Sequence, residues 1–131
     1  MSQENVEIVR AAYEFSNRMH TPDLDAFAPD CEWHTREDLP DAGARRGHDG
    51  LVKLASEWYG AFDDFRLHVE ELIDAGDSVV AVTRLRGKVR NSQREVDVPE
   101  TQVCKMRDGK VFEVRAYRTK AEALKAVGLE E

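Results

Sequence analysis

The spacing of apolar residues changes along the chain from a helical period to an alternating one. Apolar residues recur every three or four positions over residues 4–19 and again over residues 48–62. This spacing gathers apolar side chains on one side of a helix, so it predicts two amphipathic helices. Pro22 interrupts the first pattern and suits the first turn of a new helix, which predicts a short second helix over residues 23–28.

Alternating apolar and polar residues predict strands in much of the remaining chain. The first expected strand is Cys31–Arg36, on which Trp33 and Thr35 share one face while Glu32 and His34 share the other. Four further strands are expected over residues 64–73, 78–88, 95–106 and 110–117. Because only tight turns separate these four strands, neighbouring strands are expected to be antiparallel.

Helices followed by a strand meander are typical of an α+β fold. Long strands twist and curl, so we expect a curved antiparallel or mixed sheet wrapped round three N-terminal helices as a cone-shaped α+β barrel. A short C-terminal helix is expected to begin at Thr119 and to end at Gly128. Polar residues 37–47 are expected to form a loop on the rim of a pocket in the open end of the cone.

Composition narrows the choice of partners. The chain has 131 residues and a net charge of −7, with 26 acidic and 19 basic residues, which predicts one acidic domain over residues 1–131. A nucleic-acid-binding surface is normally basic, so nucleic acid is not expected as a partner. No apolar run has the length of a membrane span and the start does not resemble a secretory signal, so a cytoplasmic location is expected. Cys31 and Cys104 are therefore expected to be reduced core thiols.

Several short segments, taken together, resemble SnoaL-like proteins of the nuclear transport factor 2-like superfamily. The segments are Asn5–Tyr13, Asp23–Asp25, Asp30–His34, Gly47–Leu51, Arg107–Val111 and Tyr117–Leu124. The resemblance implies the cone-shaped fold over essentially the whole chain. It does not imply one function, because the superfamily includes isomerases, aldol cyclases, epoxide hydrolases, dehydratases and non-catalytic binding proteins.

The resemblance also shows that known catalytic patterns of the superfamily are not intact in this chain. In the limonene epoxide hydrolase pattern, Arg84 matches the arginine, but Arg86 and Ala116 replace the two carboxylates. In the ketosteroid isomerase pattern, the base falls near Thr35 and the acidic donor falls on Gln102. Neither Thr35 nor an arginine is a general base, so these two reactions are not expected by these routes.

The SnoaL-type polyketide cyclase pattern is the most similar in overall sequence. Its catalytic Asp falls on Ala116 or Val114, and Cys104 takes the place of a His. Gln102 is the candidate match for the Gln of that family. An isomerase, cyclase or dehydratase of this kind would use acid–base chemistry without a metal ion or other cofactor, and here it would need a different base.

The expected pocket holds its own set of polar and aromatic residues. Alternation along two neighbouring strands predicts that Arg84 and Arg86 face Glu100, with Gln102 and Cys104 farther along. The remaining wall residues are expected to be Tyr13, Trp33, Thr35, Trp58, Tyr59 and Phe62. Such a pocket suits a small organic ligand with a carbonyl or carboxylate group.

Two residues are candidate bases. Burial would raise the pKa of Glu100 and make it a usable base. His34 is the second candidate, because it lies close in sequence to Asp38 and Asp41, and an Asp–His pair is a common acid–base unit.

Structural roles remain open beside these functional ones. Arg84, Arg86 and Glu100 can form a cross-strand ladder of ion pairs, and His34 can be a solvated residue on the outer face. Three functions therefore stay open: a small-molecule enzyme, a non-catalytic domain that binds a small hydrophobic molecule, and a structural homodimer with a filled core. Arg115 and Tyr117 are expected on the outer sheet face, where the interface of a homodimer is expected.

Overall fold

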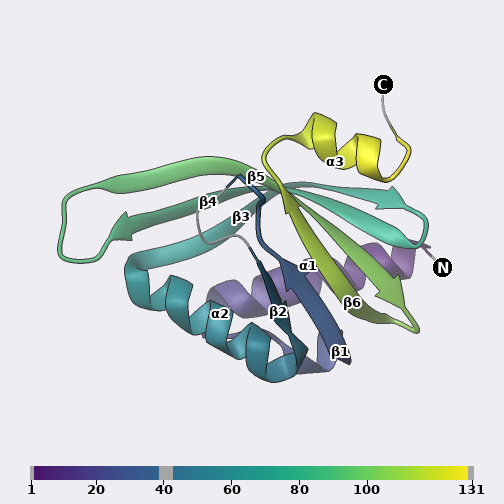
Figure 1. Cartoon of the computed structure of the whole chain (residues 1–131), viewed down its shortest axis with the longest axis horizontal. Coiled ribbons are helices and arrows are strands. Elements are labelled where there is room, and N and C mark those ends of the chain that lie inside the picture. Colours follow the sequence, from purple (N-terminus) through teal and green to yellow (C-terminus); the bar gives the residue numbers. More distant parts are fainter. Residues whose placement is uncertain (1, 39–42, 130–131) are drawn as a thin grey trace.

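The computed structural model describes residues 2–38 and 43–129, and it has the expected α+β order of elements (Figure 1). The helices are α1 (Ser2–Met19), the 3-10 helix η1 (Leu24–Ala26), α2 (Gly47–Ala61) and α3 (Lys120–Ala126). The strands are β1 (Phe27–His34), β2 (Ala44–Arg46), β3 (Phe62–Ala75), β4 (Ser78–Val89), β5 (Glu95–Arg107) and β6 (Lys110–Tyr117). Among the described helices, none has the length and apolar character needed to cross a membrane.

All six strands belong to one mixed sheet with the order β2-β1-β6-β5-β4-β3. The four later strands form the expected antiparallel meander, and β1 joins it parallel to β6 with Trp33 opposite Val114. The sheet curves over α1 and α2, while α3 lies on its other face (Figure 1). Strands β2 and β3 stand at the two ends of this order, so the cone is present but the expected barrel is not closed.

Two sequence predictions near β1 need correction. The second helix is only the 3-10 turn η1, in which Asp23 Oδ1 accepts a hydrogen bond from the Asp25 amide. Phe27 and Ala28 are buried against the sheet and already belong to β1, which therefore begins four residues before its expected start. The short strand β2 was expected to be loop, because three residues are too few to show a period. Residues 39–42, which include Asp41, lie outside the described residues.

The turn and cap signals are confirmed. Asp108 and Gly109 have φ angles of 52° and 77°, as a two-residue hairpin turn between β5 and β6 requires. At the start of α3, Thr119 Oγ1 accepts a hydrogen bond from the Glu122 amide. Gly128 follows the end of this helix with a φ of 76°, which a residue with a side chain rarely adopts.

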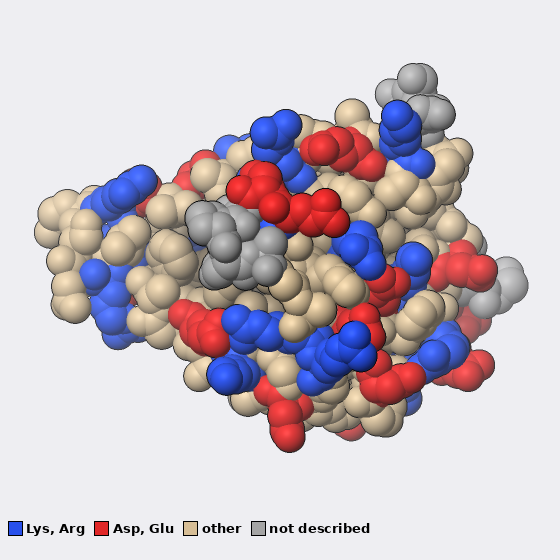
Figure 2. All heavy atoms as spheres, in the orientation of Figure 1, with Lys and Arg blue, Asp and Glu red and all other residues tan. Residues whose placement is uncertain are grey.

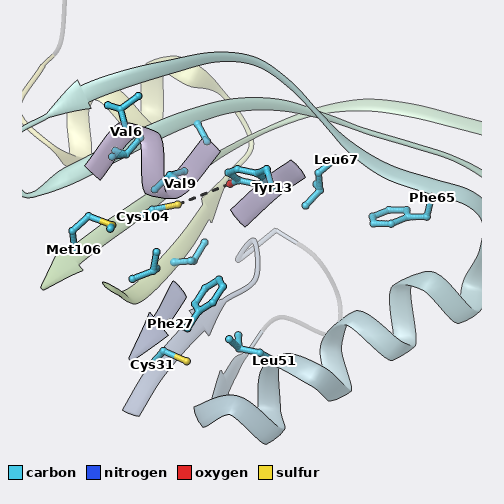
Figure 3. Close-up of a cluster of buried hydrophobic side chains, with 14 residues drawn as sticks. Val6, Val9, Tyr13, Phe27, Cys31, Leu51, Phe65, Leu67, Cys104 and Met106 are labelled. Carbon is cyan, nitrogen blue, oxygen red and sulfur yellow. Dashed lines mark hydrogen bonds between the residues drawn. The ribbon is translucent and has the colours of Figure 1, made fainter. Parts of the chain in front are cut away.

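The main apolar core lies between the concave face of the sheet and the helices α1 and α2 (Figure 3). It includes Val9 and Tyr13 of α1, Leu51 of α2, and Phe65 and Leu67 of β3. A smaller core on the opposite face joins α3 to β4 and β5, through Val80, Val103, Ala123 and Leu124. Cys31 and Cys104 are both buried free thiols. The concave core is therefore the place where an interior pocket can form.

Asn17 of α1 binds the open edge of β3. Its Nδ2 donates to the Leu67 carbonyl oxygen at 2.8 Å, and the Leu67 amide donates to Asn17 Oδ1 at 3.0 Å. An edge strand has unpaired backbone groups, and this side chain supplies both missing partners at one residue. The contact fixes α1 against the strand that carries Phe65 and Leu67.

Replacing Asn17 by alanine is expected to lower the free energy of unfolding by about 1–2 kcal/mol, because the backbone N–H and C=O of Leu67 both lose a partner. Urea unfolding followed by circular dichroism measures the change. Glu14→Ala, an exposed substitution one turn earlier on the same helix, serves as the control and is expected to change stability by less than about 0.5 kcal/mol. Equal effects of the two substitutions would contradict this role for Asn17.

Candidate functional site

The register between β4 and β5 separates the arginines from the residues they were expected to face. Thr83 lies opposite Glu100, and Arg84 lies opposite Pro99. Because side chains alternate between the faces of a strand, Arg84 lies on the convex face and Glu100 on the concave face. The prediction that Arg84 and Arg86 line the pocket with Glu100 is therefore wrong. The alternation within each strand was correct, but a one-residue slip between strands exchanges the faces.

Asp97 is the acidic partner of both arginines. Its Oδ1 lies 2.6 Å from Arg84 Nε, and its Oδ2 lies 3.4 Å from Arg86 Nε. The hydrogen bond from Arg84 holds the pKa of Asp97 below its usual range. A cross-strand ion-pair cluster is thus present, as the structural alternative proposed, but it is exposed and excludes Glu100. The concave side of the sheet therefore has no positive charge from Arg84 or Arg86.

Four buried polar side chains form a hydrogen-bonded chain on the concave side. The Tyr13 hydroxyl of α1 donates to Gln102 Oε1 on β5. Gln102 Nε2 donates in turn to Glu100 Oε2 at 2.7 Å. Cys104 Sγ lies 3.9 Å from the Tyr13 hydroxyl at the other end (Figure 3). The structure therefore brings together four of the predicted site residues, joined through a glutamine that is fully buried.

Burial controls the ionisation of this chain. It raises the pKa of Tyr13 well above its usual value and raises that of Cys104 to about 12, so both groups are neutral near pH 7. Burial also raises the pKa of Glu100, against the opposing effects of the Gln102 hydrogen bond and the charge of Arg36. A neutral thiol is a weak nucleophile, so Cys104 is a wall residue rather than a reactive one.

Glu100→Gln tests the raised pKa of Glu100 through stability. The unfolded chain releases this proton at the ordinary pKa while the folded protein still holds it, so wild-type stability falls as pH rises between the two values. The variant has no such loss. We therefore expect it to be more stable than wild type by about 1–3 kcal/mol at pH 8 and nearly equal at pH 4.

Urea unfolding at pH 4, 6 and 8 measures this difference. Glu95→Gln, at an exposed position of the same strand, is the control and is expected to show no growing advantage with pH. A Glu100→Gln variant that is less stable than wild type at pH 8 would show that the charged carboxylate is well accommodated.

Two small cavities lie beside this chain, beneath the curved sheet. Each has a volume of about 60 Å³. The first is lined by Val9, Ala12, Tyr13, Ser16, Pro22, Phe27, Trp33, Leu67, Cys104, Val111 and Val114. The second shares five of these residues and is otherwise lined by Leu51, Leu54, Ala55, Trp58, Tyr59 and Phe65. The shared wall, Ser16, Pro22, Phe27, Trp33 and Leu67, makes them adjacent lobes of one interior site.

Several predicted wall residues line these lobes and others do not. Tyr13, Trp33 and Cys104 line the first lobe, and Trp33, Trp58 and Tyr59 line the second. Phe62 instead stacks on Phe65, with ring centroids 5.5 Å apart, and is not among the lining residues described. Thr35 lies beyond the end of β1, where its Oγ1 donates to the Gly43 carbonyl oxygen. The site is thus smaller and more central than the sequence predicted.

Ser16 is a wall residue that the sequence prediction missed. It lies three positions after Tyr13 on α1, and this spacing places both side chains on the same side of the helix. Its backbone carbonyl oxygen accepts a hydrogen bond from the Tyr59 hydroxyl at 2.8 Å. The helical period of α1 indicates that Ser16 lies on the same side as Tyr13. A single serine on that side gives no further sign of a functional role.

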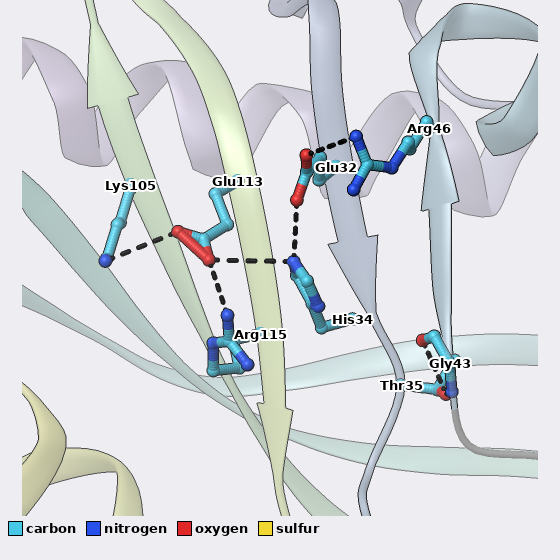
Figure 4. Close-up of polar contacts among 8 residues, drawn as sticks. All are labelled: Glu32, His34, Thr35, Gly43, Arg46, Lys105, Glu113 and Arg115. Atoms are coloured by element: carbon cyan, nitrogen blue, oxygen red, sulfur yellow. Dashed lines mark hydrogen bonds and ion pairs between the residues drawn. The ribbon is translucent and has the colours of Figure 1, made fainter.

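His34 lies on the convex face, so the structure does not bring this candidate base to the interior lobes. Its Nε2 is 2.9 Å from Glu32 Oε1 and 3.7 Å from Glu113 Oε1 (Figure 4). Glu113 also pairs with Lys105 at 3.3 Å and Arg115 at 2.9 Å. The alternation of β1 that turns Trp33 inward turns His34 outward, as the outer-face alternative for His34 proposed.

A larger, open groove of about 640 Å³ lies where β1 and β6 end. Its described lining residues are Thr35, Arg36, Glu37, Asp38, Arg115, Ala116, Tyr117, Arg118 and Glu122. Arg36 is held there by Asp38, with Nη2 and Oδ2 2.6 Å apart. Acidic and basic residues are interspersed over this side of the molecule, whereas basic residues gather at the end of the β4–β5 hairpin (Figure 2, left). The groove therefore has no single sign of charge.

No group of three or more His, Cys, Asp or Glu side chains in residues 2–38 and 43–129 is arranged to hold a metal ion. The described walls of the two interior lobes contain neither an imidazole nor a carboxylate. What the site can do chemically is enclose apolar atoms and offer hydroxyl, thiol and indole hydrogen-bonding groups.

Comparison with known proteins identifies one matching family model and many similar structures. Residues 9–114 match the model described as a SnoaL-like domain. None of the curated proteins matches the chain at a significant level. A nuclear transport factor 2-like protein from Burkholderia thailandensis is 25% identical, with a TM-score of 0.77, over 93% of this chain and 95% of that one.

Two further structures of the same fold were determined with small molecules. TerC, co-crystallised with polyporic acid, is 20% identical with a TM-score of 0.74, over 95% of this chain and 98% of that one. A protein from Catenulispora acidiphila with a ketosteroid isomerase-like fold, in complex with trimethylamine, is 16% identical with a TM-score of 0.72. That match covers 94% of this chain and 93% of the other. At these identities the likeness shows the fold.

Proposed function

This chain belongs to the SnoaL-like domain family, and on that premise we propose that it binds a small, neutral, largely apolar molecule in the two-lobed interior site. The observation that carries the proposal is the pair of adjoining lobes beneath the sheet, whose walls are mostly aliphatic and aromatic. Concave apolar sites with a few polar groups are the usual form of small-molecule sites. TerC and the Catenulispora protein, which share the fold, were each crystallised with a small molecule.

The charge of the walls favours a neutral ligand. The described lining residues of both lobes include no lysine, arginine or histidine. A carboxylate placed there would be desolvated without a cationic partner, which costs several kcal/mol. With Arg84 and Arg86 paired to Asp97 on the convex face, a carbonyl-bearing ligand is favoured over a carboxylate.

The size of the lobes limits the ligand. Each lobe of about 60 Å³ is well below the few hundred Å³ that a drug-sized ligand occupies. A ligand with a single small ring of about five or six atoms is therefore the expected size. Cyclopentanone is therefore a suitable neutral probe.

A variant that fills the first lobe tests this proposal. Ala12 lines that lobe, whereas Ala11 is exposed on the same helix. In ¹H–¹⁵N NMR titrations, cyclopentanone is expected to shift amide signals of lobe residues in wild type and Ala11→Leu. It is expected to bind Ala12→Leu at least fivefold more weakly. Unchanged binding to Ala12→Leu, or shifts confined to the outer surface, would contradict the interior site.

Acid–base catalysis is the second candidate function, as in an isomerase or cyclase. The observation that favours it is the buried chain from Glu100 through Gln102 to Tyr13, since Tyr13 reaches the wall of the first lobe. A carbonyl held there would lie near the Tyr13 hydroxyl, and a Glu100 of raised pKa would be the base. Binding ranks first because Glu100 is absent from the described walls of both lobes.

We also propose that two copies of the chain associate through the convex face of the sheet. Arg115 and Tyr117 are both half-buried on that face. Arg115 belongs to the ion pairs of Figure 4, and Tyr117 packs against the smaller core beneath α3. Because Glu113 already pairs with Lys105 and Arg115, burial there would not strand these charges. Light scattering is expected to give twice the mass of one chain, and a monomer at every concentration would contradict the proposal.

A further inference from the structure

One buried donor beside the interior site has no partner. Trp33 Nε1 is buried and makes no hydrogen bond within the described part of the chain. Only Arg86 Nε shares this condition there, and it lies 3.4 Å from Asp97 Oδ2. A buried donor without an acceptor costs about 1–3 kcal/mol, so such groups call for an explanation.

The position of the Trp33 indole suggests an explanation for its unpaired donor. Trp33 belongs to the wall that the two lobes share. The other polar side chain of the shared wall is already engaged, since the Ser16 hydroxyl lies 3.1 Å from the Tyr59 hydroxyl. The Tyr13 hydroxyl of the first lobe donates to Gln102, and the Tyr59 hydroxyl of the second lobe donates to the Ser16 carbonyl oxygen. The Trp33 indole is thus the side chain at the junction of the lobes whose N–H donor is still unpaired. Because that N–H is covered in this structure, a ligand must displace neighbouring atoms to reach it.

We propose that the Trp33 indole N–H determines ligand specificity by donating a hydrogen bond to a neutral acceptor, a carbonyl or ether oxygen, on a small ring. This inference rests on the proposed function. It gives the ligand a defined orientation in the site, with the acceptor oxygen toward Trp33 and the apolar ring atoms toward Phe27 and Leu67. Hydrocarbons of the same size would fit the lobes but leave the donor unpaired.

Two probes of the same ring size separate the contributions of shape and hydrogen bonding. Cyclopentanone carries the acceptor, and cyclopentane lacks it. The chain has two tryptophans, so its spectrum holds two indole signals, and Trp58→Phe assigns them. Trp58 lines the second lobe but is not an unpaired buried donor, which makes Trp58→Phe the matched control for Trp33→Phe.

Binding of both probes to the three proteins is measured by NMR titration. Trp33→Phe is expected to lose about three- to tenfold in its affinity for cyclopentanone relative to cyclopentane, the loss of one hydrogen bond. Trp58→Phe is expected to keep the wild-type ratio. In wild type, the Trp33 indole signal is expected to move downfield with the ketone and much less with the hydrocarbon.

The outcomes separate this inference from the function on which it rests. If both probes bind in the lobes but the affinity ratio survives in Trp33→Phe, the role of the indole is overturned and the interior site stands. If neither probe shifts any signal of the lobe residues, the proposed function fails, and the inference fails with it. If Trp58→Phe also loses the preference for cyclopentanone over cyclopentane, that preference comes from ring packing and the role of the Trp33 donor is overturned.

Discussion

Replacing Gln102 by leucine is expected to lower the free energy of unfolding by about 3–5 kcal/mol. The side chain is fully buried and joins two other buried groups, the Tyr13 hydroxyl and the Glu100 carboxyl. Leucine has a similar volume but leaves both groups without this partner, each at a cost of about 1–3 kcal/mol and more for a charged group. Urea unfolding at pH 7 measures the loss.

Urea unfolding at two pH values separates the contribution of the Glu100 carboxyl from that of the Tyr13 hydroxyl. Glu100 is neutral at low pH, so the cost of Gln102→Leu is expected to be smaller at pH 4 than at pH 8. Gln93→Leu, on the exposed β4–β5 turn, is the control and is expected to change stability by less than about 0.5 kcal/mol. A Gln102→Leu variant as stable as this control would contradict the polar chain.

Replacing Phe65 by alanine is expected to lower the free energy of unfolding by a comparable amount, about 3–5 kcal/mol. Phe65 is 5% exposed, and its ring lies between 5.3 and 5.5 Å from those of Trp58, Tyr59 and Phe62. The substitution removes these aromatic contacts and leaves a cavity that the surrounding side chains fill only in part.

Phe112→Ala is the matched control for Phe65→Ala. Phe112 is half-buried on β6, where the guanidinium of Arg107 lies 4.8 Å from its ring centroid. Thermal and urea unfolding are expected to show a clearly smaller loss for this variant. Phe65 also lines the second lobe, so Phe65→Ala is expected to bind cyclopentane more tightly than wild type does. Equal losses for the two variants would show that the aromatic cluster does not anchor the core.

The order of elements could be predicted from the sequence because each period is a local property. The helical period placed α1 and α2 to within two residues, and alternation placed β4, β5 and β6 to within one residue. Strand β2 could not be predicted because a segment of three residues shows no period. The start of β1 was not predicted because Pro22 and the residues after it also suit the start of a helix. Phe27 and Ala28 were therefore assigned to that helix.

The site was harder to predict because it depends on which strand faces meet. Alternation shows that Arg84 and Arg86 share a face, and that Glu100 and Gln102 share one. Alternation does not show whether the two pairs share a face of the sheet. A shift of one residue in the register between β4 and β5 moves one pair to the opposite face. The structure places Tyr13, Trp33 and Cys104 on the wall of the first lobe, where the apolar faces of the elements that carry them meet.

The corrected register changes the chemistry expected of the ligand. With arginines in the pocket, a carboxylate was a reasonable ligand. With Asp97 holding both arginines on the convex face, the described interior offers uncharged donors and apolar walls. Among the described residues, Glu100 is the one charged side chain in the buried set, so the other described charges lie at least partly at the surface.

The most direct test is a crystal structure of the protein soaked with cyclopentanone. The account predicts density for the ring in the lobes between α1, α2 and β1, with the ketone oxygen within hydrogen-bonding distance of Trp33 Nε1, about 3 Å. Filled lobes with the oxygen turned away from Trp33 would keep the site but contradict the role of the indole. Empty lobes, in crystals whose probe lies on the surface or in the groove lined by Arg36 and Arg118, would contradict the central claim.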